Sequence, residues 1–389
     1  MKSAATSPIG VPDPDTGDYV GSDSNEYWDM RLTVGVSCQN GLPHLSRCLA
    51  SLPALVGCAE KMDFILVDSA SSDGTLATML AFASGRPDTR VYSMSGIVNL
   101  AATRNVILSN ARPGAVFLVD GDIAVTRAFV DAALEEFRAG RCEIAYGRLP
   151  EILYDKQARP YGRTVDRYKV ADKGYAKHFG GVVIFAPQLL AEGVRYDETL
   201  RRAEDLALST ALADKFRIQR LPIEMGVHHS VAYYHPDRIG DFYRKAYMRP
   251  YGRLIVDNLT RPWRIWNVRR GISGYVLGFA LVVFLLGAIV SGSLVAVALA
   301  VAAIAFDIAR FYRQGRLSSW VPTRLVGMAQ LVWGVMLPER QRLDYVVRER
   351  FSGTQSPGPD IAAAARFGMD PLGASPASGV RTSAVDTRA

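Results

Sequence analysis

The chain has 389 residues, of which 49% are hydrophobic and 21% are charged, a composition typical of a folded protein rather than of a disordered one. This length suits one large α/β domain with an appendage, or two modest domains. The net charge of +7 is concentrated, because residues 236–270 hold nine Lys or Arg against three Asp directly before the most hydrophobic stretch. That position favours a membrane surface over nucleic acid as the partner of the basic groups, with a solvated basic face as the alternative.

The cysteines and the chain ends indicate the compartment. The chain holds four cysteines, none of them in a CxxC pair: Cys38, Cys48, Cys58 and Cys142. This pattern predicts reduced thiols that pack in the core of a cytoplasmic domain. Residues 1–29 lack the apolar run of a signal peptide, so we expect the main domain to remain in the cytoplasm. Residues 1–29 and 351–389 are predicted to be disordered tails.

Between residues 30 and 235, short apolar runs alternate with segments of helical periodicity, which predicts an α/β domain with a mostly parallel sheet. Strands are expected at residues 32–37, 64–67, 90–94, 116–119 and 182–185, and helices at residues 45–52, 75–82, 99–108 and 126–137. In open α/β sheets, ligands bind beyond the carboxyl ends of the strands. Asp68 follows one buried strand, and Asp120 and Asp122 follow another, so we expect these three carboxylates to converge.

The segment Asp120-Gly121-Asp122 has the strongest chemical logic. Its two carboxylates flank a glycine that lets a ligand approach the backbone closely. Oxygen ligands at this spacing suit Mg²⁺ or Mn²⁺, which would neutralise the charge that develops on a nucleoside-diphosphate leaving group. An acidic surface turn is the alternative, and the position behind a buried strand favours the metal site.

Three other positions have both a functional and a structural interpretation. Asp68 could accept hydrogen bonds from a base N–H or a ribose hydroxyl. Asp73 is expected to cap the helix that begins near Thr75 rather than to contact a ligand. Arg104 could hold a diphosphate in forked geometry, or it could form an ion pair within the domain.

The pair Glu204-Asp205 lies at the start of a predicted helix. Displacement by a hydroxyl group needs a carboxylate that takes the proton from the attacking oxygen, and either residue could act as that base. The alternative is favourable pairing of acidic groups with a helix N-terminus, which needs no chemistry. Gly180-Gly181, directly before a predicted strand, would let a sugar approach the backbone.

Taken in order along the chain, these segments resemble the family 2 glycosyltransferases, which have a GT-A fold. The likeness runs from about residue 31 to residue 214, roughly half of the chain. It rests on an ordered set of segments: Val34-Gly35-Val36-Ser37-Cys38-Gln39-Asn40, Asp68 with Ser72-Asp73-Gly74-Thr75, Arg104-Asn105, Asp120-Gly121-Asp122, Gly180-Gly181 and Glu204-Asp205-Leu206. The expected fold class is therefore α/β, with a GT-A (Rossmann-like, mostly parallel sheet) catalytic domain over residues 30–235, followed by a C-terminal transmembrane helical hairpin.

The resemblance implies which residues hold the donor and the metal. Asp68 and Asp120 would bind the nucleotide-sugar, with Arg104 near the nucleotide pocket. Asp122, together with Asp120, would bind the divalent metal. Family members often have a second Asp at the position of Ser69, so Asp68 would make that contact alone in this chain.

The resemblance also implies the catalytic base of an inverting transfer. Asp205, together with Glu204, would take this role. His228-His229 lies where some related enzymes place a further metal or phosphate contact, and a structural histidine pair is the favoured interpretation here.

Residues 236–270 form the predicted basic juxtamembrane and acceptor segment. Within it, residues 242–253 look like the segment before the membrane helices in bacterial exopolysaccharide-assembly members of the family, including succinoglycan-type enzymes. Arg249 or Arg253 would there hold an acceptor phosphate, with a basic belt that has no specific ligand as the alternative. The Gln-x-x-Arg-Trp motif of the processive synthases does not occur in the sequence, which favours a single-addition enzyme.

Residues 271–306 form a run of 36 residues without a charge. A membrane span needs about 20 apolar residues, so a transmembrane hairpin is predicted over residues 271–309. Arginines stand before and after this run, and the positive-inside bias then places both ends in the cytoplasm. Residues 318–350 carry Arg324 and Gln330 among apolar residues, so an interfacial helix is predicted there, with a third membrane helix as the alternative.

The resulting hypothesis is an inverting, metal-dependent hexosyltransferase at the cytoplasmic face of the inner membrane. It would transfer a sugar from a nucleotide-diphosphate sugar to a lipid-linked or glycan acceptor, with Mn²⁺ or Mg²⁺ as cofactor, membrane lipids as further partners and no nucleic acid. The non-enzyme alternative is a catalytically silent membrane-bound subunit that partners another synthase. A nucleotidyltransferase is disfavoured, because residues 38–43 lack the Gly-rich basic loop usual after its first strand.

Overall fold

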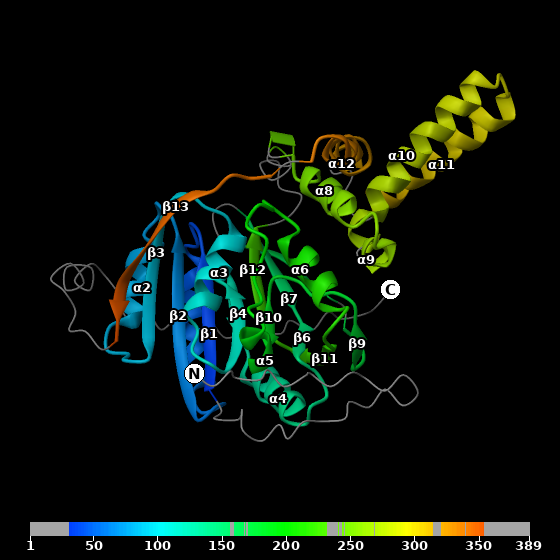
Figure 1. Cartoon of the computed structure of the whole chain (residues 1–389). Coiled ribbons are helices and arrows are strands. Elements are labelled where there is room, and N and C mark those ends of the chain that lie inside the picture. The colour runs from blue at the N-terminus through cyan, green and yellow to red at the C-terminus, as the bar shows by residue number, and fades with distance from the viewer. Residues whose placement is uncertain are drawn as a thin grey trace, which may run out of the picture.

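A computed structural model of the protein describes residues 31–155, 159–166, 168, 170–231, 240, 243–244, 246–267, 269–313, 320–338 and 340–353. The tail predicted over residues 1–29 lies outside the described residues, and so does the C-terminal tail beyond residue 353. The described chain forms an α/β body from which a pair of long helices projects (Figure 1).

The body is built on a nine-stranded sheet in the order β13-β3-β2-β1-β4-β10-β6-β11-β9. Its strands are β1 (Arg31–Cys38), β2 (Lys61–Ser69), β3 (Thr89–Ile97), β4 (Ala115–Asp120), β6 (Ile144–Arg148), β9 (Gly174–Ala176), β10 (Val183–Phe185), β11 (Ile218–Glu224) and β13 (Asp344–Ser352). Strands β3, β2, β1 and β4 are mutually parallel, as the alternation of strands and helices predicts.

The second half of the sheet differs from the prediction. β10 runs antiparallel to both β4 and β6, and the edge strands β9 and β13 are antiparallel to their neighbours. The sheet is therefore mixed, and the prediction of a mostly parallel sheet holds only for its first four strands and for the pair β6–β11. The reason is that β9 and β10 have three residues each, too few to show a direction in the sequence.

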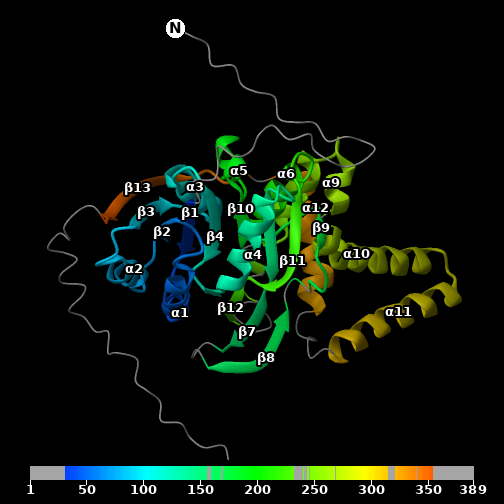
Figure 2. The ribbon, with the colours of Figure 1, turned by 90° about the horizontal axis from the view of Figure 1, so that it is seen from below.

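Helices cover both faces of this sheet. They are α1 (His44–Ser51), the short helix η2 (Leu52–Leu55), α2 (Thr75–Ala83), α3 (Leu100–Asn110), α4 (Arg127–Arg138), α5 (Pro187–Ala191) and α6 (Glu204–Leu212). Figure 2 shows α1 and α3 on opposite sides of β1 and β2. Phe117 of β4 packs against Phe129 of α4, with ring centroids 5.8 Å apart and both side chains fully buried. The four cysteines are free and buried, which confirms their expected role in packing.

A second sheet of four strands lies beside the first, in the order β5-β12-β7-β8. Its strands are β5 (Ile123–Val125), β7 (Pro150–Tyr154), β8 (Pro160–Asp166) and β12 (Gly226–Val231). β5 begins two residues after Gly121, so this sheet continues directly from the carboxyl end of β4.

The register of the parallel strands brings the predicted acidic residues together. Asp68 lies opposite Cys38 in the pair β2–β1, and Asp120 lies opposite Ser37 in the pair β4–β1. Both carboxylates therefore stand at the same edge of the sheet, as the topology rule for α/β sheets predicts.

The C-terminal part consists mainly of helices: α8 (Arg249–Asp257), α9 (Pro262–Asn267), α10 (Arg269–Val290), α11 (Leu294–Arg313), η4 (Pro322–Val326) and α12 (Gly327–Met336). Two of them are long and apolar enough to cross a membrane, with mean hydropathies of 2.4 over Ser273–Val290 and 2.2 over Leu294–Arg313. Only 12% and 17% of these stretches are buried in the protein, whereas the core helix of a soluble protein would be mostly buried. They form the projecting pair in Figure 1.

Arg324 and Gln330 are the polar residues that argued against a full membrane span within residues 318–350. Both have partners within the protein. Arg324 donates to Asp307 of α11 from Nε and Nη2, at 2.7 and 2.9 Å, and its Nη1 donates to the carbonyl of Gly274 on α10. Gln330 accepts a hydrogen bond from the backbone N–H of Met248, just before α8. These contacts attach η4 and α12 to the bases of both long helices and to α8.

The segment after α12 corrects the predicted boundaries. The helix expected within residues 318–350 ends at Met336, and residues 344–352 form β13 instead. β13 lies along the outer edge of β3, so the chain returns to the α/β body after the two apolar helices (Figure 1). Sequence pattern could not show this, because an edge strand rich in charged side chains has no apolar alternation.

The pairing of β13 with β3 predicts a specific disulfide. Ser95 lies opposite Val346 in the register, and both side chains are exposed, so the variant Ser95→Cys/Val346→Cys is expected to form a disulfide on mild oxidation. Reduction-sensitive mobility on a denaturing gel measures it. The matched control is Ser95→Cys/Val347→Cys, which moves one cysteine to the other face of the strand. Equal cross-linking in both variants, or none in either, would contradict the register.

Candidate active site

The centre of the predicted site is the guanidinium group of Arg104 on α3, a residue that is 1% exposed. Its Nη2 donates to Asp120 Oδ1 at the end of β4, and its Nη1 donates to Glu204 Oε1 at the start of α6, both at 2.9 Å. Ser37 Oγ also donates to Asp120 Oδ1, at 3.3 Å. Of the two interpretations open for Arg104, the structure shows the ion pair within the domain.

The sequence around Arg104 explains why α3 can hold this position. Asn99 is the N-cap of the helix, and its Oδ1 accepts from the backbone N–H of Ala102. Asn105 exchanges hydrogen bonds with the backbone of Tyr196 in both directions, at 2.8 and 2.9 Å. The motif Arg104-Asn105 therefore fixes the segment that leads into Glu204.

Three carboxylates compete for this single cation. Burial alone would lower the pKa of Arg104, but Asp120, Glu204 and Asp205 outweigh it and hold that pKa above its ordinary value. Glu204 is the most buried carboxylate of the three, and burial together with the charge of Asp205 raises its pKa to about 7 against the opposing effect of Arg104. Near neutral pH, the Glu204 carboxyl therefore carries part of a proton.

Asp205 is half-buried in the first turn of α6, beside Glu204. Its Oδ1 accepts from the backbone N–H of Leu206 at 2.8 Å, which is the contact expected of an acidic group near a helix N-terminus. Tyr251 of α8 lies close enough for the Asp205 charge to raise the tyrosine pKa further, after burial, which is the larger cause. The structure thus places Asp205 between the sheet and α8, where both interpretations of the pair remain open.

Asp122 is held from one side by a histidine. His228 Nε2 lies 3.0 Å from Asp122 Oδ2, and His228 Nδ1 lies 2.9 Å from Glu151 Oε1. Burial would lower the pKa of His228, but the two carboxylates raise it to about 9, so the ring is an imidazolium at neutral pH. Burial would likewise raise the pKa of Asp122, and the hydrogen bond from His228 holds it below its ordinary value.

The second carboxylate oxygen of Asp122 is the candidate ligand for the expected metal. Asp122 Oδ1 is buried and has no hydrogen-bond partner among the described residues. No group of three or more His, Cys, Asp or Glu in the described part of the chain forms a complete metal site. Mg²⁺ and Mn²⁺ are usually held by one or two carboxylates, with phosphate and water oxygens as the other ligands. Asp122 Oδ1, with Asp120 nearby, fits that arrangement.

Asp68 has the features of a ligand contact. It is 3% exposed, its Oδ2 accepts from the backbone N–H of Ser71 at 3.3 Å, and its Oδ1 is buried without a partner among the described residues. Burial raises the pKa of Asp68 more than the bonds from Ser71 lower it. Asp73 instead accepts from the N–H and hydroxyl of Thr75, the first residue of α2, whereas the N-cap position itself is Gly74.

Three residues in the left-handed backbone region surround this edge of the sheet. Asn40 follows β1, Ala70 follows β2 and Ala203 precedes α6, with φ angles of +48°, +58° and +62°. Such conformations cost alanine about 1–2 kcal/mol, and they persist where the surrounding structure over-determines them. The three loops that carry the site are therefore held in defined conformations.

Gly181 shows why one predicted glycine is required. A Cβ on this residue would lie 2.4 Å from Arg104 Nη2 and 3.1 Å from Asp120 Oδ2. Gly180 is similarly close to the hydroxyl of Tyr168. The glycines therefore make room for the ion pair at the centre of the site, whereas the sequence interpretation gave that room to a sugar.

The structure gives partners within the protein to the arginines proposed for the acceptor. Arg253 is 4% exposed and donates to Asp197 and Asp257, at 3.0 and 3.1 Å. Arg249 lies over the ring of Trp333, 4.1 Å from its centroid, and donates to a backbone carbonyl at 3.2 Å. Both guanidinium groups thus hold α8 against its surroundings.

Sequence analysis did not find several residues that shape the site. Glu151 and the segment around Gln341 carry no local motif, because their roles depend on neighbours that the fold brings from elsewhere. His229 was interpreted as structural, and its side chain lies among Arg47, Tyr154 and His44, while its backbone N–H donates to the carbonyl of Asp122 at 2.8 Å. Only the adjacent pair of histidines in the sequence hinted at His228.

Comparison with known proteins supports the resemblance for part of the chain. Residues 33–188 match the family model of glycosyl transferase family 2, so this segment carries the sequence signature of that family. The match includes Asp68, Arg104, Asp120 and Asp122 and ends before Glu204. A search of curated proteins found no match.

One solved structure shows the same fold at low sequence identity. The mannosyltransferase PcManGT from Pyrobaculum calidifontis, in complex with GDP-Man and Mn²⁺, is 19% identical with a TM-score of 0.56, over 78% of this chain and 87% of that chain. Residues 1–349 of S. aureus TarS, in complex with UDP-GlcNAc, are 19% identical with a TM-score of 0.45, over 58% of this chain and 67% of that chain. The match spans 43% of the longer TarS structure. The α/β body is thus a GT-A-like fold with a mixed sheet.

The raised pKa of Glu204 predicts a pH-dependent stability. A carboxyl whose pKa is raised on folding contributes stability below its unfolded pKa, near 4.5, and loses it as the pH rises through about 7. Replacement by a neutral amide, Glu204→Gln, removes this loss. The melting temperature of Glu204→Gln relative to the natural chain should therefore increase between pH 5 and pH 8, by the equivalent of up to about 3 kcal/mol.

Thermal unfolding followed by intrinsic fluorescence measures the difference. The control is Glu224→Gln, an exposed glutamate of β11, whose melting temperature should follow that of the natural chain at every pH. A difference for Glu204→Gln that is constant across the range would show that Glu204 is ionised throughout.

Proposed function

We propose that the protein is an inverting glycosyltransferase that takes a sugar from a nucleotide-diphosphate sugar and acts at the cytoplasmic face of a membrane. The observation that carries this proposal is the convergence of Asp68, Asp120, Asp122 and the Glu204-Asp205 pair at one edge of a GT-A-like sheet. The segment that holds the first three carboxylates matches the family 2 model. The neighbours with bound UDP-GlcNAc or GDP-Man and Mn²⁺ make the same donor class the first to test.

Each end of the donor has a group of the right chemistry. Asp68 Oδ1, buried and without a described partner, would accept a hydrogen bond from the base or ribose. Asp122 Oδ1, with Asp120, would hold the divalent metal, which neutralises charge on the departing diphosphate when it is bound. His228 and Glu151 keep Asp122 oriented from behind. Arg104 keeps Asp120 in place.

The transfer itself needs one proton acceptor. An acceptor hydroxyl loses its proton to the Asp205 carboxylate while its oxygen forms a bond to the anomeric carbon, and the bond from that carbon to the nucleoside diphosphate breaks. Glu204 is engaged by Arg104 and is partly protonated near neutral pH, which leaves Asp205 as the better base. Attack from the face opposite the leaving group inverts the configuration at the sugar carbon.

The two apolar helices support a membrane anchor with a defined topology. α10 and α11 are long enough to cross, whereas α12 has ten residues and is too short. β13 follows these helices and pairs with β3, so both chain segments that flank the hairpin stand on the side of the α/β body. An even number of crossings satisfies this constraint, and a third span does not. Arginines at both ends of the hairpin assign that side to the cytoplasm.

The function is tested by binding of a panel of nucleotide-sugars to the detergent-solubilised chain, with and without Mn²⁺. We expect metal-dependent binding of one donor, and its loss in Asp122→Asn. Asp205→Asn should bind that donor normally, and its sugar transfer should be slower by about 10²–10⁴-fold, because only the proton acceptor is missing. The control is Asp131→Asn, an exposed aspartate of α4 that should leave both properties unchanged.

Binding of no donor by the natural chain, with or without metal, would reject the transferase and favour a silent subunit. Equal donor binding by Asp122→Asn would reject the metal site, and normal transfer by Asp205→Asn would reject the assigned base.

The topology is tested by labelling of introduced cysteines, because the four natural cysteines are buried. Ser293→Cys lies in the turn between α10 and α11, and Asp344→Cys lies at the start of β13. A membrane-impermeant maleimide added to intact cells should label only the first, and permeabilised cells should show labelling of both. Labelling of Asp344→Cys in intact cells would contradict the hairpin.

A further inference from the structure

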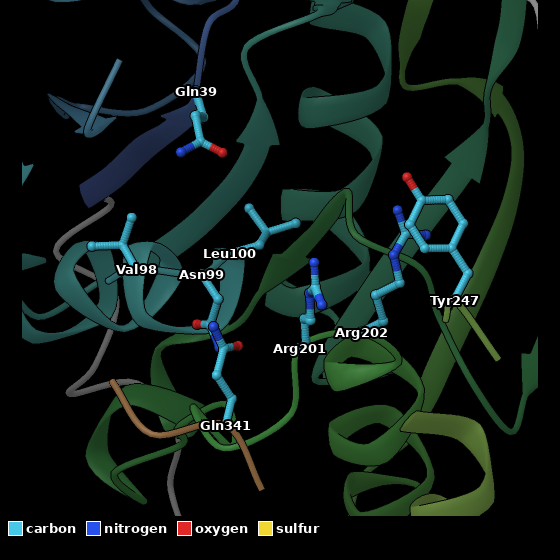
Figure 3. A pocket seen from close by; sticks show the side chains of 8 residues that line it. All are labelled: Gln39, Val98, Asn99, Leu100, Arg201, Arg202, Tyr247 and Gln341. Carbon is cyan, nitrogen blue, oxygen red and sulfur yellow. The ribbon is translucent and has the colours of Figure 1, made fainter. Parts of the chain in front are cut away.

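A pocket of about 370 Å³ opens beside Arg201 and Arg202 (Figure 3). It is lined by residues from five separate parts of the chain: Gln39, Val98, Asn99, Leu100, Arg201, Arg202, Tyr247 and Gln341. The first four come from the carboxyl ends of β1 and β3 and the start of α3, and the two arginines directly precede α6. Tyr247 precedes α8, and Gln341 lies between α12 and β13.

The two arginines of this pocket have no carboxylate partner among the described residues. Arg201 and Arg202 are exposed, neither forms an ion pair with the described residues, and no carboxylate lines the pocket. The Arg202 guanidinium lies over the ring of Tyr247, 3.5 Å from its centroid, which holds it at the pocket wall. By contrast, Arg104 and Arg253 are neutralised by carboxylates. Two adjacent free guanidinium groups in a concave site favour a phosphate group.

Gln341 adds a neutral donor to the same wall. Its Oε1 accepts from Asn99 Nδ2 at 3.0 Å, and its backbone N–H donates to the carbonyl of Thr199 at 2.9 Å. The carboxamide is thereby fixed with its Nε2 amide left for a ligand. Asn99 is the N-cap of α3, so the return segment is connected directly to the helix that carries Arg104.

The origin of the lining residues indicates the side from which the ligand arrives. Tyr247 belongs to the chain that enters the apolar helices and Gln341 to the chain that leaves them. The donor diphosphate is assigned to Asp122, which does not line this pocket. We infer that Arg201 and Arg202 bind the phosphate of a membrane-borne, phosphate-bearing lipid acceptor. This inference rests on the proposed function and moves the acceptor phosphate from Arg249 and Arg253 to this pocket.

The test measures binding of a short isoprenoid phosphate, citronellyl phosphate, to the full chain in detergent without nucleotide-sugar. Calorimetry should show binding of the phosphate and not of citronellol, the alcohol with the same hydrocarbon chain. Arg201→Gln/Arg202→Gln should weaken this binding at least about tenfold, since each lost charge-assisted bond is worth on the order of tenfold. Arg201→Lys/Arg202→Lys should restore part of it.

The matched control is Arg112→Gln/Arg127→Gln, which removes two partly exposed arginines elsewhere on the body and should bind the probe as the natural chain does. Nucleotide-sugar binding and melting temperature are measured on the same variants and should not change. Unchanged binding of citronellyl phosphate by Arg201→Gln/Arg202→Gln would overturn the inference. Parallel loss of nucleotide-sugar binding would also overturn it, because the arginines would then belong to the donor site.

The last measurement uses inorganic phosphate as the probe. Inorganic phosphate that binds as tightly as citronellyl phosphate would show a general anion site and would overturn the acceptor assignment. Failure of the proposed function has a different signature, because the natural chain would bind no nucleotide-sugar whether or not it binds the isoprenoid phosphate.

Discussion

The buried guanidinium of Arg104 is the constraint on which the site depends. A cation removed from water must be paired with carboxylates that are themselves well hydrogen-bonded, or the fold loses several kcal/mol. The chain meets this requirement with Asp120 from the end of β4 and Glu204 from the start of α6, two segments far apart in the sequence. The same pairing keeps the loop before α6 on the sheet and requires glycine at position 181. The spacing between metal-site carboxylates and base is therefore set by a charge that touches no substrate in the proposed mechanism.

Two sets of arginines in this protein differ in burial and in their carboxylate partners. Arg104, Arg253 and Arg324 are buried and each is neutralised by carboxylates, so they hold the sheet, α8 and the base of the helical pair together. Arg201 and Arg202 are exposed and have no such partners among the described residues. Burial and pairing thus distinguish arginines that stabilise the fold from arginines that remain available to a ligand.

The sequence predicts the parts of this molecule that depend on local pattern. The first four strands and their helices, and the convergence of Asp68 and Asp120, follow from periodicity and strand-end position. The mixed half of the sheet and β13 do not, because their strands are three residues long or rich in charged side chains. The partners of Arg249 and Arg253 also escape prediction. A basic run has the same appearance whether its carboxylates are absent or supplied by distant segments.

The return of the chain in β13 has a consequence for the order in which the protein is made. Synthesis proceeds from the N-terminus, so β3 and the rest of the sheet leave the ribosome long before residues 344–352. Until both apolar helices have been synthesised, the edge of β3 has no neighbouring strand and the wall formed by Gln341 is missing. A nascent chain therefore cannot complete its pocket before its two apolar helices exist. The fold thus makes the pocket depend on a segment that is synthesised after both of these helices.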